Sequence, residues 1–102
     1  MGSRLNLHEE LCGILGSRNV YYNPPESMKL KYPCIVYALD GVDKHNANNH
    51  RYNSTTRYQV TVIESSPDSV YYDKILDHFP MSNFDRAYPS NDLHHKVYTI
   101  YY

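Results

Sequence analysis

An uninterrupted apolar segment at residues 33–39, which reads PCIVYAL, limits the fold of this chain more than any other part of its sequence. Its β-branched and aromatic residues favour a strand, and the lack of polar positions indicates that both faces of that strand are covered. Pro33 suits the first position of a strand, and Asp40 with Gly41 suits its end. The chain is therefore predicted to fold around a central strand of a β-sheet.

A second strand is predicted at residues 55–64, where polar Arg57, Gln59 and Thr61 alternate with apolar residues. It should pair antiparallel with residues 33–39. The segment between them, residues 41–54, has almost nothing to bury. It is therefore predicted to be an exposed loop or the protruding tip of a long hairpin.

The N-terminal part of the chain predicts a helix and a short strand. Residues 6–15 carry leucine and isoleucine at helical spacing, with Asn6 and Glu9 as a variant capping box and Gly16 as the end. Residues 19–22 are predicted to form a short strand, and Pro24 with Pro25 then predicts an extended connector.

The C-terminal part predicts a second helix and two strands. Ser66 as N-cap, Pro67 and Asp68 favour a helix start, and the helix should run to His78. Residues 81–88 are predicted to form a strand with Phe84, Arg86 and Tyr88 on one face. A turn at residues 89–92 leads to a final strand at 94–102.

These elements predict one α+β domain over residues 1–102. Because hairpins predominate, the sheet should be mainly antiparallel, with about four to five strands and two helices packed on one face. A long protruding β-hairpin loop is part of the same prediction. No apolar segment approaches the roughly 20 residues of a membrane-spanning helix, so no membrane partner is expected.

Composition narrows the class of function. The chain has twelve tyrosines and no tryptophan, and such side chains suit half-buried sheet faces and interfaces, although they also simply fill strands. The formal net charge of -1 argues against a protein whose affinity comes mainly from neutralising phosphates.

Residues able to carry catalysis or bind a metal are present, but their spacing does not favour a site. His94 and His95 are adjacent in a predicted strand and should point to opposite faces. Cys34 lies in an apolar segment, where burial raises the pKa of a thiol and blocks access. Cys12 and Cys34 are both predicted to be buried and reduced, with a disulfide left open. We therefore expect no enzyme activity, cofactor or metal.

One stretch combines basic and aromatic residues, as a surface for single-stranded nucleic acid does. Its members are Lys44, His45, Arg51, Tyr52, Arg57 and Tyr58. A solvated flank of a hairpin has the same composition, and the acidic residues elsewhere favour that interpretation. A small single-strand nucleic-acid-binding module remains an alternative function.

Five segments resemble the small neck proteins of long-tailed phages and prophages, in particular the tail terminator or tail-completion family. They are YPCIVY at residues 32–37, RYQVTVI at 57–63, SPDS at 66–69, FDR at 84–86 and YTIYY at 98–102. The resemblance runs through nearly the whole chain in order. Other small head-tail connector or head-closure proteins remain alternatives.

The resemblance implies a structural protein without an active site. Such a subunit forms a homo-oligomeric ring, expected to be a hexamer, that caps the tail tube and provides the surface on which the head docks. The implied partners are copies of itself, the tail-tube protein and a head-connector protein, while DNA passes through without specific binding. The implied location is the bacterial host cytoplasm during assembly and then the virion.

The resemblance also implies that residues 41–54 reach the tail tube. Together with the polar composition of this stretch, it gives a predicted assembly interface. Its members are Asp40, Asp43, Lys44, His45, His50, Arg51, Tyr52 and Arg57.

Overall fold

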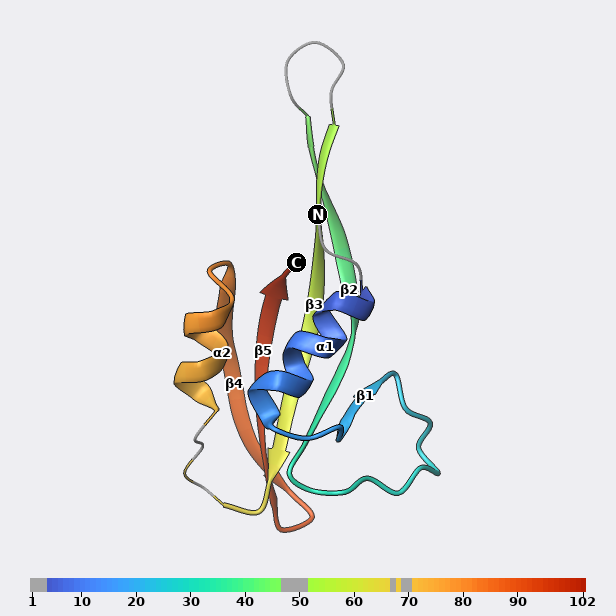
Figure 1. Cartoon of the computed structure of the whole chain (residues 1–102), viewed down its shortest axis with the longest axis vertical. Coiled ribbons are helices and arrows are strands. Elements are labelled where there is room, and N and C mark those ends of the chain that lie inside the picture. The colour runs from blue at the N-terminus through green and yellow to red at the C-terminus, as the bar shows by residue number, and fades with distance from the viewer. Residues whose placement is uncertain (1–3, 47–51, 67, 69–70) are drawn as a thin grey trace.

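A computed structural model describes residues 4–46, 52–66, 68 and 71–102. The elements in chain order are α1 (Arg4–Leu15), β1 (Val20–Tyr22), β2 (Cys34–Asn46), β3 (Tyr52–Glu64), α2 (Tyr72–His78), β4 (Ser82–Ser90) and β5 (Leu93–Tyr101). The strands form one five-stranded sheet in the order β1-β2-β3-β5-β4 (Figure 1). The predicted α+β fold is confirmed.

Strand directions in the sheet are mixed. β1 pairs with β2 in parallel, whereas the pairs β2–β3, β3–β5 and β5–β4 are all antiparallel. The prediction of a mainly antiparallel sheet therefore holds for every pair except the short β1. β2 and β5 run in one direction, and β3 and β4 run in the other.

Both helices cover the same face of the sheet (Figure 1). The core between the two layers joins one side of each helix to alternate residues of the strands. Its fully buried members are Leu7, Leu11, Ile35, Tyr37, Val60, Val62, Ile75, Tyr98 and Ile100. Tyr37 stacks at a tilt between Tyr22 and Tyr58, with ring centroids 5.0 and 6.2 Å away. Tyrosine thus supplies part of the core itself.

The apolar segment of β2 is covered on both faces only where it begins. Cys34 and Ile35 point to opposite faces and are both 0% exposed. Cys34 is in register with buried Ile63 on the face without helices. Farther along, Leu39 is 51% exposed, so the prediction of a strand buried on both faces fails at its end.

The predicted starts of both helices are wrong. α1 already includes Arg4, so Asn6 lies inside the helix, and Glu9 instead accepts two hydrogen bonds from Arg18 at 2.8 and 2.9 Å. α2 begins only at Tyr72. The hydroxyl of Ser66 accepts a hydrogen bond from the N–H of Asp68 at 3.2 Å. This local turn competes with the helix that Ser66 was expected to cap.

A bulge in β4 corrects the predicted face of its side chains. The register shifts between Phe84, which pairs with Tyr98, and Arg86, which pairs with Val97. Because Tyr98 and Val97 are consecutive, Phe84 and Arg86 lie on opposite faces rather than on one. The bulged strand ends in a two-residue turn in which Asn91 and Asp92 have positive φ, as a type I′ hairpin requires.

The segment predicted as an exposed loop or as the protruding tip of a long hairpin is largely a strand pair. β2 and β3 stay in register out to Asn46 and Tyr52, so residues 41–46 and 52–54 are paired rather than looped. The connecting residues 47–51 lie outside the described residues, and so does the protruding loop that was predicted there. We call residues 41–46 and 52–56 the arm. It extends beyond the ends of β4 and β5 along the 52 Å long axis of the molecule (Figure 1).

Candidate functional site: the arm and its base

The base of the arm is built around an ion pair between two of the predicted interface residues. Nε of Arg57 donates a hydrogen bond to Oδ2 of Asp40 at 2.9 Å. Asp40 is the extra residue of a β-bulge between Leu39 and Gly41. A bulge bends a strand and increases its twist, so the arm leaves the sheet in a direction that this bulge sets.

Gly41 allows the guanidinium of Arg57 to lie across the strand. A Cβ at position 41 would overlap Nη2 of Arg57 and touch its Cζ. Gly41 and Arg57 are also cross-strand partners in the register. The missing side chain at Gly41 therefore provides the space in which Arg57 reaches Asp40.

The other predicted interface residues lie farther along the arm. Asp43, Lys44 and His45 pair through their backbones with Thr55, Ser54 and Asn53, and Tyr52 pairs with Asn46. The structure therefore places these four residues on paired strands but does not describe their side chains. His50 and Arg51 lie outside the described residues.

Apolar side chains at the arm base were missed by sequence reasoning. Leu39 was assigned to a buried strand and Val42 to a polar loop, yet they are 51% and 52% exposed. Leu39 is in register with Tyr58 and Val42 with Thr56, so both lie on the face of the sheet that carries the helices. Leu5, in the first turn of α1, is also exposed. Only the tertiary fold shows that these side chains are left exposed.

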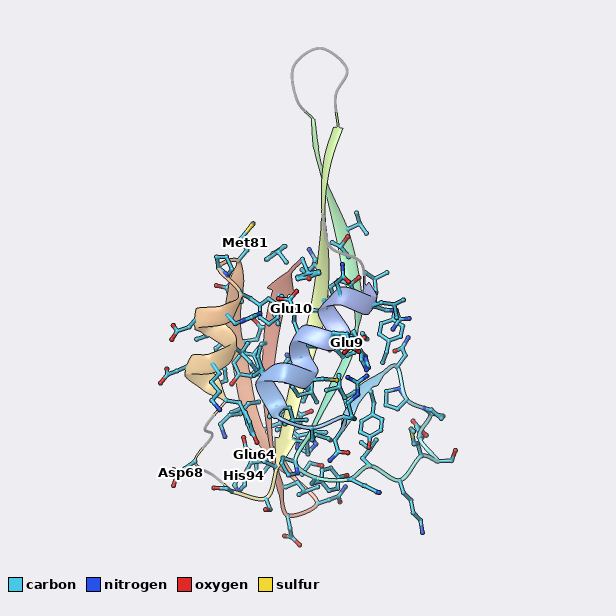
Figure 2. The ribbon with its side chains drawn as sticks, in the orientation of Figure 1. Glu9, Glu10, Glu64, Asp68, Met81 and His94 are labelled. Carbon is cyan, nitrogen blue, oxygen red and sulfur yellow. The ribbon has the colours of Figure 1, made fainter. Side chains whose placement is uncertain are left out.

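The C-terminus connects the arm to both helices. The N–H of Tyr102 donates to the carbonyl of Thr56 at 3.0 Å, and its hydroxyl donates to Oε2 of Glu10. Oε1 of Glu10 lies 2.7 Å from Nε2 of His78 in α2. Figure 2 shows Glu10 on the side of α1 that faces this junction and Glu9 on the other side.

The hydrogen bonds at this junction shift the pKa values of Glu10 and Tyr102. The bond from Tyr102 holds the pKa of Glu10 below its ordinary value, and the contact with His78 adds to this effect. The same bond, together with burial, raises the pKa of Tyr102 to about 12. Sequence reasoning did not bring Glu10, His78 and Tyr102 together, because partners so distant in the chain leave no local signal.

A hollow of about 360 Å³ lies at the turn end of β4 and β5. It is lined by Ala87, Tyr88, Pro89, His94, His95 and Lys96. His95 stacks on Tyr88 with ring centroids 4.9 Å apart, and His94 is in register with Glu64. Figure 2 places Glu64 and His94 together at the end of the body opposite the arm. The hollow is therefore separate from the arm base.

The groups considered for catalysis or metal binding are dispersed. Burial raises the pKa of the Cys34 thiol to about 11, so the thiol is protonated near neutral pH. Cys12 is also a buried free thiol. Within residues 4–46, 52–66, 68 and 71–102, no three histidine, cysteine or acidic residues are grouped as a metal site would require.

Comparison of the chain with models of known protein families, with curated proteins and with solved structures finds no match. Among the helices that the structure describes, none is long and apolar enough to cross a membrane.

Proposed function

We propose that this chain is a structural subunit of a phage or prophage neck, which forms a ring that caps the tail tube and provides the docking surface for the head. The observation that carries the proposal is the arm, a strand pair that leaves the sheet at a base fixed by Asp40, Gly41 and Arg57. Two of the five segments that resemble tail terminator proteins, residues 32–37 and 57–63, lie largely in β2 and β3, the strands from which this arm extends.

The arm supports an assembly role because such a structure is weakly stable alone. A two-stranded ribbon is marginal in water, and three or more strands or packing on another surface are needed to stabilise it. Exposed Leu39 and Val42 at its base offer apolar area to a partner. Contact with copies of the chain and with a tail-tube protein would supply the missing surface.

The charge of the chain fits a passage for DNA. A formal net charge of -1 gives little attraction for phosphates, and a ring through which DNA slides should not hold it by phosphate contacts. Copies of the chain, a tail-tube protein and a head-connector protein are the proposed partners. Other head-tail connector or head-closure proteins share these properties.

The structure weighs against the single-strand nucleic-acid alternative. Arg57, one of its basic residues, is paired with Asp40. Tyr58, one of its stacking residues, is only 8% exposed and packs in the core. Two of the side chains expected to contact a single-stranded nucleic acid therefore already make contacts within the protein itself.

The proposal is tested by capping of tail tubes. Tubes are assembled from a cognate tail-tube protein, the full-length protein is added, and tube ends are examined by negative-stain electron microscopy. We expect ring-shaped density at one end of each tube and an end to tube growth. Native mass spectrometry of the same mixture should show a hexamer. A chain that stays monomeric and leaves tube growth unchanged contradicts the proposal.

A matched pair of variants assigns the capping to the arm base. Arg57→Ala removes the partner of Asp40 at the arm base, whereas Arg18→Ala removes the partner of Glu9 in an exposed pair of the body. We expect weaker capping with Arg57→Ala and unchanged capping with Arg18→Ala. Equal effects would show that the arm base has no special part in the contact.

A further inference from the structure

The sheet has two open edges of similar length. β4 forms one of them, because its nine residues pair only with β5 and their side chains are almost all exposed. On the other side, β1 covers β2 only at residues 35–37. Within the described part of the chain, no strand pairs with the outer edge of residues 38–46, which are as many as the residues of β4.

Backbone alternation shows which groups of β4 point outward. The N–H of Tyr101 donates to the carbonyl of Met81 at 2.9 Å, which fixes the phase of the β4–β5 ladder. When the register is followed through the bulge, Ala87 pairs with Lys96. At this position the N–H and the carbonyl of Ala87 point away from β5. Pro89, which has no N–H, occupies the next outward position. The usable part of this edge therefore ends near Ala87.

The same reasoning applies to β2. The N–H of Ile35 donates to the carbonyl of Asn19 at 3.0 Å, and the carbonyl of Tyr37 accepts from the N–H of Asn23 at 3.0 Å. The backbone groups of Ile35 and Tyr37 therefore face the outer edge of β2. Alternation through the bulge then places the N–H groups of Leu39 and Val42 on the outer edge. Each open edge therefore presents outward-pointing backbone groups, those of Ala87 on β4 and those of Leu39 and Val42 on β2, with which another strand could pair.

The strand directions suit pairing between copies in one orientation. β4 runs opposite to β2 within the sheet. When a second copy is placed beside the first without inversion, β4 of one copy therefore meets β2 of the next antiparallel. Antiparallel pairing is the more stable arrangement per residue.

The two edges are offset along the strands. Arg86, in the middle of β4, pairs with Val97, which pairs with Thr61, and Thr61 pairs with Val36, so Arg86 and Val36 lie at the same level of the sheet. To face Val42 instead, a neighbour must shift by about five ladder positions, or roughly 17 Å, because Asp40 is the extra residue of the bulge. The four strands from β2 to β4 repeat every roughly 19 Å across the sheet, so this shift corresponds to a strand tilt of about 40°, within the range of closed β-barrels.

Exposed apolar residues mark the same two edges. The structure has eight large apolar side chains that are well exposed among the described residues. Four of them lie on these segments, namely Leu39, Val42, Phe84 and Tyr88. Each edge thus carries two apolar side chains that a neighbouring strand would cover.

We propose that copies of this chain join by antiparallel pairing of β4 with residues 38–46 of β2 in the next copy. The inference rests on the proposed function, because it names the contact between ring subunits. One kind of edge meets the other, so the contact is heterologous and repeats around an axis until it closes. Closure covers both of the long edges described above, which reduces the tendency of exposed strands to aggregate.

Two proline substitutions test each side of the contact. Ala87→Pro and Val42→Pro each delete an outward N–H while leaving the hydrogen bonds inside the subunit in place. Ala87→Thr and Val42→Thr are the matched controls, because they change the side chain and keep the N–H. By analytical ultracentrifugation of the full-length chain, we expect both proline variants to be monomeric and both threonine variants to assemble like the wild type.

Mixing the two proline variants distinguishes this contact from a symmetric one. Ala87→Pro keeps an intact β2 edge and Val42→Pro keeps an intact β4 edge, so a 1:1 mixture should form a dimer that grows no further. Pairing of β4 with β4 would instead let Val42→Pro dimerise alone, keep Ala87→Pro monomeric, and give no dimer that contains both variants on mixing. That result would overturn the proposal.

Amide exchange tests the same contact without a variant. In the assembled wild type, exchange at residues 38–46 and 82–87 should be slower than in the diluted monomer. Unchanged exchange at both edges would overturn the proposed strand pairing, and so would assembly of the proline variants like the wild type. Either result would still be compatible with a ring whose subunits meet through another contact. If the wild type assembles only on tail tubes, the same variants are compared by the fraction of capped ends. A wild type that neither assembles nor caps tubes overturns both proposals.

Discussion

The hydroxyl of Tyr102 donates a hydrogen bond to the carboxylate of Glu10, 92 positions earlier in the chain. The same carboxylate contacts Nε2 of His78, and the ring of Phe79 meets that of Tyr102 edge-on at 6.0 Å. α1, α2 and the end of β5 therefore meet at one acid. Because Tyr102 is also bonded to Thr56, the junction lies directly beneath the arm.

Replacing Glu10 should weaken this junction. Glu10→Ala removes the acceptor of Tyr102 and the partner of His78, and we expect the free energy of unfolding to fall by about 1 kcal/mol, because the carboxylate is partly exposed. Urea denaturation followed by circular dichroism measures the change. Glu9→Ala is the control, since Glu9 bonds only to exposed Arg18, and it should have a smaller effect. Equal losses from both variants would contradict the role of the junction.

The raised pKa of Tyr102 predicts a loss of stability in alkali. Its folded pKa, about 12, lies above the ordinary value of 10, so the protonated hydroxyl is favoured by folding. The contribution is complete below pH 10 and is lost as pH rises through the folded pKa. Tm measured between pH 8 and 12 should therefore fall more steeply for the wild type than for Tyr102→Phe, which lacks the hydroxyl. Parallel curves would contradict the prediction.

Local patterns in the sequence were sufficient to predict the two strands at the core of the sheet. The apolar segment at residues 33–39 and the alternation at 55–64 correctly predict two paired strands, because burial of one or both faces leaves a periodic signal. The sequence predicted a protruding hairpin between these strands, but the strand pairing within the arm was missed for the same reason. Its strands carry no apolar alternation, and their pairing follows from continuation of the ladder that the buried residues begin.

Other features depend on contacts that local patterns do not encode. The bulge after Phe84 reverses the face of every later side chain in β4, and one inserted residue is enough to do so. Asp40 and Arg57 were both predicted as interface residues, but only the fold shows that they form an ion pair with each other. Leu39 belongs to the apolar segment of β2 and is nevertheless 51% exposed, because burial depends on which elements pack over a strand and not on the strand's own sequence.

Both cysteines should be unreactive until the chain unfolds. Cys34 is 0% exposed and burial raises its pKa to about 11, while burial also raises the pKa of Cys12. Ellman's reagent at pH 8 should therefore modify neither thiol rapidly in the native protein and both in urea. The Cys34→Ala variant identifies which thiol reacts. Rapid modification of Cys34 in the native state would contradict the burial on the face of the sheet without helices.

Gly41→Ala tests whether the arm base depends on the position of Arg57. The added methyl group should displace the guanidinium from Asp40, which costs little overall because the end of an arginine side chain is flexible. We expect a loss of about 0–1 kcal/mol by urea denaturation, which is the range of an exposed ion pair.

A double-mutant cycle separates this effect from simple crowding. Asp40→Ala removes the same ion pair, so adding Gly41→Ala to it should cause no further loss. Additive losses would mean that Gly41 serves another purpose, such as the backbone geometry of the bulge. Because the bulge sets the direction of the arm, both single variants should also reduce capping of tail tubes, and Arg18→Ala should not.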